Sequence, residues 1–320
     1  MTAKRQDELL GLYRVMARIR AAETHLIKLF ADGEVPGFIH LSIGQEAVAA
    51  GVMACLEARD TIATTHRGHG HVIARGIDLE PFFKEIMGKA GGVCGGRGGS
   101  MHIADVSLGV LGANGIVGAG IPIGMGSAVA HRVRKTGGVA VVFFGDGAMA
   151  EGALHEALNL AALWQLPLVL VCENNGWSEF SPTSRQFSGT LRGLAAAFGI
   201  DYAHVDGSDV QAVVEAAQAA VGRARGGAPA VLECATRRVR GHYEGDPQKY
   251  RDPVEIAELD AHDPLRRGAA ALMSAGVKRD AIAAIGTGIE AEMTAAIAAA
   301  RADVLPDFDA ALADVYTAQG

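Results

Sequence analysis

Apolar and polar positions between Val139 and Trp177 follow two different periods. Val139 to Phe144 is an unbroken apolar run rich in β-branched and aromatic residues, which indicates a strand buried on both faces. A second such run covers Leu168 to Cys172. From Glu151 to Gln165 the apolar residues recur at steps of three and four, the period of an α-helix; they are Leu154, Leu158, Ala161 and Trp164. The pattern predicts a strand–helix–strand unit.

The loops that follow the two strands are expected to lie side by side. A helix of about 15 residues returns the chain by roughly 22 Å, and about seven strand residues carry it roughly 23 Å forward again. Gly145-Asp146-Gly147 and Asn174-Asn175 therefore meet at the carboxyl edge of the sheet. Ligands of open parallel sheets bind at that edge.

The two loops together supply one carboxylate, one or two amide oxygens and a backbone freed by glycine. These hard oxygen donors suit Mg²⁺ or Ca²⁺ and suit zinc poorly. The helix after Gly147 adds free N–H groups, and the N-terminus of a helix favours an anion. A diphosphate bridged to the protein by Mg²⁺ fits this combination.

Further helices and strands precede and follow the central unit. The expected elements are a long amphipathic helix at Asp7–Phe30, a helix from after Ser42-Ile43-Gly44 to Leu56, a strand at Asp60–Thr65, a polar loop at Ser178–Thr190, helices at Leu191–Phe198 and Val210–Ala224, strands at Asp201–Val205 and Ala230–Val239, and Ala-rich helices from Asp263 to Tyr316, interrupted near Gly276 and Pro306. Alternating strands and helices predict an α/β fold, in which helices cover both faces of a parallel sheet.

Glycine is concentrated between Gly88 and Ser127. Apolar residues interleaved with the glycines favour a packed loop over a low-complexity linker. Glycine at this density also permits close approach of the backbone to a ligand. The segment runs into a helix expected at Gly120–Arg134, whose Gly120, Gly124 and Ser127 form a small-residue face suited to tight packing against another subunit.

Composition narrows the class of protein. The chain has 320 residues, of which 49% are hydrophobic, enough for a large core, and no change of composition marks a linker. We expect one domain over residues 1–320, with an N-terminal helical segment at 1–59, the sheet at 60–262 and C-terminal helices at 263–320. The net charge of −7 and the lack of a basic run argue against nucleic acids and anionic membranes as partners.

The cysteines and the N-terminal sequence bear on the compartment. Cys55, Cys94, Cys172 and Cys234 lie far apart and form no C-x-x-C pair, so we expect reduced core residues of a cytoplasmic protein. The first 20 residues keep their charges throughout and predict neither a signal peptide nor a membrane span.

Several short sequence motifs resemble those of a known family. GDG, twenty-six further residues and NN have the spacing of the thiamine diphosphate motif. GDGAMAEG, EALNLAALWQLPLV and ENNGW are similar to the alpha subunits of the dehydrogenase components of 2-oxo acid and acetoin dehydrogenase complexes. The resemblance covers nearly the whole chain and implies the thiamine diphosphate-binding fold, with N- and C-terminal helices packed around the sheet.

The resemblance implies how a cofactor and a metal are held. Asp146, Asn175 and the carbonyl of Trp177 would bind Mg²⁺, and two phosphate oxygens and a water would complete six ligands. The backbone around Gly115 and Val117, in a segment similar to the family word GNGIVG, would contact the aminopyrimidine ring. The remaining cofactor contacts implied near the metal are Gly145, Asp146, Gly147, Ala148 and Asn175.

The segment Thr65–His71 resembles the family's diphosphate-binding segment. His66 replaces the usual tyrosine and can still donate a hydrogen bond, and Arg67 matches phosphate oxygens bidentately. The alternate histidines His66, His69 and His71 could be taken for zinc ligands, but a zinc set would still need orienting partners.

Two more histidines match functional positions of the family. His40 matches a histidine that faces the active site, and His242 matches one in a mobile loop that contacts the diphosphate and serves catalysis. Tyr243 replaces a regulatory phosphoserine of animal pyruvate enzymes, so that control is not expected. Relatives place an apolar residue under the bent cofactor where this chain has Glu179, whose role stays open.

The resemblance also implies partners and a substrate. A glutamate activates the cofactor in thiamine enzymes, and this chain has room only for the pyrophosphate-type domain. A transketolase-like beta subunit would therefore supply the glutamate, most simply in an α₂β₂ tetramer, and a lipoyl-bearing acyltransferase core would receive the acyl group. The loop wording HYEGDPQ favours acetoin as substrate, with pyruvate and branched-chain 2-oxo acids as alternatives.

Two other classes of protein remain as alternatives: a nicotinamide-dependent oxidoreductase and a non-catalytic Mg²⁺-binding subunit. Gly118-x-Gly120 and Gly145-x-Gly147 resemble the start of the dinucleotide motif G-x-G-x-x-G. The third glycine is displaced in both cases, to Gly124 and Gly152, which disfavours the nicotinamide reading.

Overall fold

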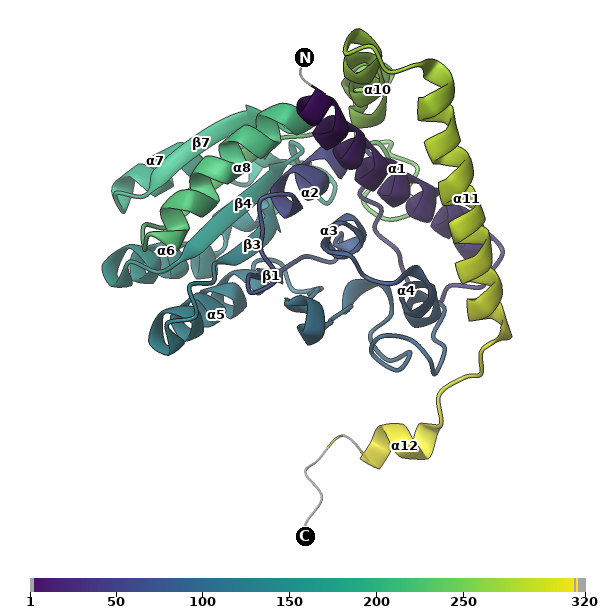
Figure 1. Cartoon of the computed structure of the whole chain (residues 1–320). Helices are drawn as coiled ribbons and strands as arrows, with labels where there is room; N and C mark the ends of the chain where they lie inside the picture. The colour runs from purple at the N-terminus through teal and green to yellow at the C-terminus, as the bar shows by residue number, and fades with distance from the viewer. Residues whose placement is uncertain (1–2, 314, 316–320) are drawn as a thin grey trace.

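A six-stranded sheet forms the centre of the computed structural model, which describes residues 3–313 and 315. Every strand pairing in it is parallel, and the strand order is β2-β1-β3-β4-β8-β7. Figure 1 labels β1, β3, β4 and β7 of this sheet. Its strands are β1 (Thr61–Ala63), β2 (Val110–Gly112), β3 (Ala140–Gly145), β4 (Leu168–Asn174), β7 (Asp201–Asp206) and β8 (Ala230–Ala235). The predicted α/β architecture with a parallel sheet is confirmed.

Helices cover both faces of this sheet because successive residues of a buried strand point to opposite sides. Val142 and Phe144 of β3 pack into a core cluster with one helical layer, whose members are α5 (Gly120–Arg134), α6 (Gly152–Trp164) and α7 (Leu191–Ala197). Val141 and Phe143 belong to a second cluster on the other face. The helices there are α2 (Glu46–Met53), α3 (His69–Arg75) and α8 (Val210–Arg225), with α1 (Ala3–Ala31), α4 (Leu79–Ile86) and α11 (Arg279–Ala302) outside them.

Helix α11 runs along the outside of α1 and α4 (Figure 1). It is long and apolar enough by composition to cross a membrane. In the fold, however, one stripe of it is buried in the core cluster that also contains α1 and α4. On the α1 side Glu292 forms an ion pair with Arg18 at 2.7 Å. These contacts explain its apolar residues as those of a helix packed on a folded domain.

The C-terminal helices interrupt close to the expected points. α10 (Pro264–Ser274) ends before Gly276, and α12 (Phe308–Ala313) begins after Pro306. The expected end of this region at Tyr316 lies outside the described residues. One further helix, α9 (Pro253–Glu258), follows the loop that carries His242.

Several elements differ from the sequence expectations. Strand β8 stops at Ala235 instead of Val239, because the chain leaves the sheet and the Val239 N–H donates to the Ile43 carbonyl at 3.1 Å. The expected polar loop at 178–190 contains a short hairpin, β5 (Trp177–Ser178) with β6 (Ser181–Pro182). Strand β2 and helices α3 and α4 were not predicted.

The glycine-rich segment is a packed loop, as predicted, and it contains two 3₁₀ turns, at Gly99–Met101 and Val106–Leu108. The small-residue face of α5 has a different partner from the one expected. A side chain at Gly124 would overlap Val142 of β3, and Ser127 Oγ lies 2.7 Å from Thr61 Oγ1. This face packs on the chain's own sheet, so the prediction that it serves subunit packing is wrong.

Candidate active site at the carboxyl edge of the sheet

A cavity of about 250 Å³ opens at the carboxyl ends of β1, β3 and β4. The loops after β3 and β4 meet there as the strand and helix lengths predict, since Gly145 pairs in register with Glu173. Every residue predicted for the site lines this cavity; the residues are His40, His66, Arg67, Gly115, Val117, Gly145, Asp146, Gly147, Ala148, Asn175, Trp177 and His242.

Asp146 forms the acidic end of the cavity. It opens a 3₁₀ turn, Asp146–Ala150, directly after β3 and is 1% exposed. The Asn175 N–H reaches its Oδ1 at 3.4 Å, and the Thr183 hydroxyl donates to its Oδ2. Burial raises the pKa of Asp146 to about 6, because the loss of hydration outweighs the hydrogen bonds to the carboxylate and the attraction of Arg238. A divalent cation at this carboxylate would reverse that penalty.

Asn175 is held in place by both ends of its amide. Its Oδ1 accepts a hydrogen bond from the Trp177 N–H at 3.1 Å, and its Nδ2 donates to Gln45 Oε1 at 3.2 Å. An amide oxygen has a second lone pair, so Oδ1 remains able to bind a hard cation. Asp146, Asn175 and Trp177 thus surround one end of the cavity with oxygen donors.

Two buried guanidinium groups give the cavity its positive charge. Arg67 donates to the Leu41 carbonyl at 2.7 Å and to the His242 carbonyl at 3.0 Å. Arg238 is 1% exposed and donates to the Glu179 carbonyl at 3.1 Å. Burial and the repulsion between the two cations lower the pKa of Arg67 to about 10, and burial lowers the pKa of Arg238. Among the described residues, no carboxylate pairs with either one.

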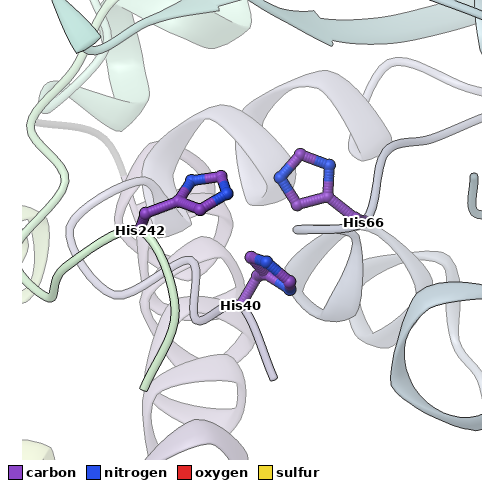
Figure 2. Close-up of side chains that lie close together, drawn as sticks. All are labelled: His40, His66 and His242. Carbon is purple, nitrogen blue, oxygen red and sulfur yellow. The ribbon is translucent and has the colours of Figure 1, made fainter. Parts of the chain in front are cut away.

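Three histidines from distant parts of the chain converge in the cavity (Figure 2), which Arg67 also lines. The ring centroids of His40 and His66 lie 4.6 Å apart, and those of His40 and His242 lie 4.9 Å apart. Burial and, next, the charge of Arg67 lower their pKa values, to about 3 for His40, about 2 for His66 and about 4 for His242. All three are therefore neutral at pH 7.

The spacing of this cluster resembles a zinc site, because one nitrogen from each ring lies within 4.8 Å of the others. The charge around it opposes that use. Arg67 and Arg238 already disfavour a proton on His40, His66 and His242, and they would repel a dication more strongly. The same positive field attracts an anion.

The alternate histidines of the segment after β1 separate in the fold. His66 lines the cavity, whereas His69 and His71 are buried in α3 with partners of their own. His69 Nε2 lies 2.8 Å from Ser100 Oγ, and His71 Nδ1 lies 2.5 Å from Thr64 Oγ1. The three rings are held in different environments and form no common ligand set.

Some residues at the site were not predicted from the sequence, among them Arg238, Gln45 and Thr183. Arg238 was overlooked, although its position just after β8 is a signal, since side chains beyond a strand's carboxyl end reach the ligand edge. Gln45 and Thr183 contact the proposed metal ligands, and no local pattern marks either one. Glu179 adopts a left-handed backbone conformation with φ 54°, and its carbonyl accepts a hydrogen bond from Arg238. Its main chain therefore helps to hold Arg238, a contact that does not depend on the type of its side chain.

Buried side-chain nitrogens without a hydrogen-bond partner indicate whether the cavity suits an anionic ligand. Arg238 Nε, His242 Nδ1 and His40 Nδ1 are buried without a hydrogen-bond partner in the described part of the chain. Buried polar atoms normally find a partner, so a ligand with several acceptor oxygens would satisfy them. A diphosphate near the arginines, with a cation at Asp146 and Asn175, matches both ends of the cavity.

Comparison with known proteins assigns the chain to a group of enzymes. A family model described as "Dehydrogenase E1 component" matches residues 14–308. The chain is 48% identical over 264 residues to the alpha subunit of acetoin:2,6-dichlorophenolindophenol oxidoreductase from Bacillus subtilis, an overlap of 82% of this chain and 79% of that one. It is 45% identical over 317 residues to the subunit of the same name from Cupriavidus necator, covering 97% and 95% of the two chains. The pyruvate dehydrogenase E1 component subunit alpha of Zymomonas mobilis is 44% identical over 276 residues, covering 85% and 78%.

Proposed function

The chain belongs to the dehydrogenase E1 component family, and we propose that it is the alpha subunit of a member that cleaves acetoin. Because it belongs to this family, the protein is an oxidoreductase of the thiamine diphosphate-dependent type, acting on acetoin or a 2-oxo acid. The choice of acetoin is supported by the loop wording HYEGDPQ and by the two relatives named for acetoin. Pyruvate and branched-chain 2-oxo acids are the alternative substrates.

The observation that best supports this function is the distribution of charge in the cavity, which has two arginines and a separate group of oxygen donors. Arg67 and Arg238, two buried cations without carboxylate partners in the described chain, supply the charge for a diphosphate. Asp146, Asn175 and the Trp177 carbonyl would hold Mg²⁺ against its phosphate oxygens. Gly145, Gly147 and Ala148 line the cavity next to Asp146 and would contact that end of the ligand.

The histidines would work at the reacting end of the cofactor. Bound thiamine diphosphate supplies a carbon nucleophile that adds to the substrate carbonyl and accommodates the negative charge that develops. His40 and His242 are neutral, so each can donate from one ring nitrogen and accept at the other. They can therefore pass a proton to or from the substrate oxygen, while His66 donates a hydrogen bond beside them.

A beta subunit is the partner expected for an alpha subunit. We propose that it supplies the glutamate that activates the cofactor, in an α₂β₂ tetramer, and that a lipoyl-bearing acyltransferase core receives the acyl group. Apolar side chains at the cavity support a covering partner, since Ile116, Val117 and Phe180 are 72%, 49% and 45% exposed. The four free cysteines support a cytoplasmic location.

Co-expression with a beta chain from the same genome tests the proposal. The purified complex should contain thiamine diphosphate by mass spectrometry and should reduce 2,6-dichlorophenolindophenol when acetoin is added. Pyruvate and branched-chain 2-oxo acids should support a slower reaction. A complex that carries a nicotinamide cofactor, or that binds Mg²⁺ without reacting with any of these substrates, would overturn the proposal in favour of one of the other two classes.

A further inference from the structure

Glu85 of α4 is a fully buried carboxylate, and its hydrogen-bond partners among the described residues are backbone N–H groups. Its Oε2 accepts from Cys94 at 2.7 Å and from Gly96 at 2.9 Å. Its Oε1 accepts from Gly98 at 2.7 Å and from Gly99 at 3.0 Å. A single side chain thus gathers four amides of the glycine-rich segment around itself.

The glycines of this segment are what allow the amides to surround Glu85. A side chain at Gly92 would overlap the Glu85 carboxylate and lie 2.7 Å from its Cα. Gly96 and Gly99 have φ values of +74° and +57°, a left-handed conformation that glycine adopts without strain. The segment GGVCGGRGG is therefore the stretch of backbone that surrounds the Glu85 carboxylate.

A second buried carboxylate fixes the end of the same segment. Ser100 Oγ lies 2.8 Å from His69 Nε2, and His69 Nδ1 lies 3.3 Å from Glu23 Oε1. The Glu23 carboxylate also accepts from the Ser42 N–H at 2.7 Å. Met101, the next residue, lines the cavity. The anchored segment thus passes directly into the wall of the active site.

The wall at Gly115 and Val117 rests on this anchored segment. The Ala113 N–H donates to the Ile103 carbonyl at 2.9 Å, which pairs the chain just before the wall with the chain just after Met101. A side chain at Gly115 would lie 3.7 Å from the His102 ring. No hydrogen bond of Glu85 among the described residues involves the metal end of the cavity.

We propose that Glu85 is a positioning residue for the half of the site that binds the aminopyrimidine ring. By holding residues 94–99 it fixes Met101 and His102, and through them the backbone that faces the ring at Gly115 and Val117. The identity of the ligand rests on the function proposed above. The diphosphate and Mg²⁺ end of the site is independent of Glu85.

Glu85→Gln tests this role, because the amide keeps the shape of the side chain but turns an –NH₂ toward N–H donors. In the full chain, amide exchange of residues 94–103 should become about tenfold faster. In the complex with the beta chain, thiamine diphosphate should bind about tenfold more weakly, the order expected for losing hydrogen bonds to a charged acceptor. Binding of Mg²⁺ with inorganic pyrophosphate, and turnover at saturating cofactor, should match wild type.

Glu80→Gln is the matched control, since Glu80 lies on the same helix but is exposed and pairs only with Lys84 among the contacts described. It should change none of these measurements. Should Glu85→Gln fail to fold, Ser100→Ala removes only the hydroxyl at the second anchor and should produce a smaller change of the same kind.

Two results would overturn the proposal: unchanged amide exchange at 94–103, or equal weakening of pyrophosphate and of thiamine diphosphate. A wild-type complex that binds no thiamine diphosphate would instead refute the proposed function. The exchange measurement on the chain alone would then still decide whether Glu85 anchors the segment.

Discussion

Acidification should destabilise the chain through the three cavity histidines. The folded-state pKa values of His66, His40 and His242 are lowered to about 2, 3 and 4, whereas an unfolded histidine titrates near 6.5. As the pH falls below 6.5, histidines of the unfolded chain take up protons, whereas the three histidines of the folded cavity do not. Folding stability present above pH 6.5 is therefore lost progressively as the pH falls toward the folded-state pKa values of about 2 to 4.

The size of this loss follows from the linkage relation. Between pH 7 and pH 5 one shielded histidine accounts for about 1.9 kcal/mol of the free energy of unfolding. His242 borders solvent and is counted at about half, so the cluster accounts for about 5 kcal/mol. Asp146 opposes it: its folded pKa is raised to about 6, so it favours the folded state by about 1.3 kcal/mol more at pH 5 than at pH 7. The net loss is about 3.5 kcal/mol.

Urea denaturation of the purified chain at pH 7, 6 and 5, followed by circular dichroism, measures this loss. His66→Gln removes one titrating group from the cavity, so it should lose about 2 kcal/mol less than wild type between pH 7 and pH 5. His204→Gln is the control, because His204 is exposed on the edge strand β7 and lies outside the cavity. If His66→Gln and wild type lose the same stability on acidification, the cluster is not shielded and the reasoning is wrong.

Three further predictions concern the proposed cofactor and partner. Mg²⁺ and thiamine diphosphate at a hundredfold excess over the dissociation constant should stabilise the wild-type complex by about 2.7 kcal/mol and raise its melting temperature. Asp146→Ala should abolish this rise, and an equal rise in the variant would refute the metal assignment. His242→Ala should keep cofactor affinity within about tenfold but slow turnover by roughly 10²- to 10⁴-fold in a steady-state assay; unchanged turnover would make it an ordinary loop residue. The chain without a beta subunit should be catalytically silent, and turnover on the order of 10 per second would show that the activating glutamate lies in this sequence.

Local periodicity predicted most of the sheet and the meeting of its loops. The span from Val139 to Trp177 is a continuous strand–helix–strand pattern, so Asp146 and Asn175 could be brought together by counting residues alone. His40, His66 and His242 needed the family resemblance, because nothing local says that segments this far apart in sequence share one cavity. Their neutrality is a further step, since it depends on burial beside Arg67 and not on residue type.

The misjudged features depend on what each segment packs against. The small face of α5 has the same composition whether it contacts a second subunit or a strand, and only the placement of Val142 decides the matter. The buried anchor Glu85 looks like one more helical glutamate in the sequence. Its proposed role depends on the glycines that follow it. Their density predicts a packed loop and close approach of the backbone to a ligand, but it does not indicate that the backbone surrounds a carboxylate.

Helix α4 packs against α11, which is synthesised much later than α4. Phe82, Phe83 and Ile86 of α4 share a core cluster with Ile289 and other residues of α11, about two hundred positions later in the chain. At typical translation speeds of roughly 5 to 20 residues per second, that cover is made some 10 to 40 seconds after α4. Until then the apolar face of the helix that carries Glu85 is exposed on the nascent chain. A chain truncated before α11 would therefore lack the cover of α4 and leave this part of the core open to water.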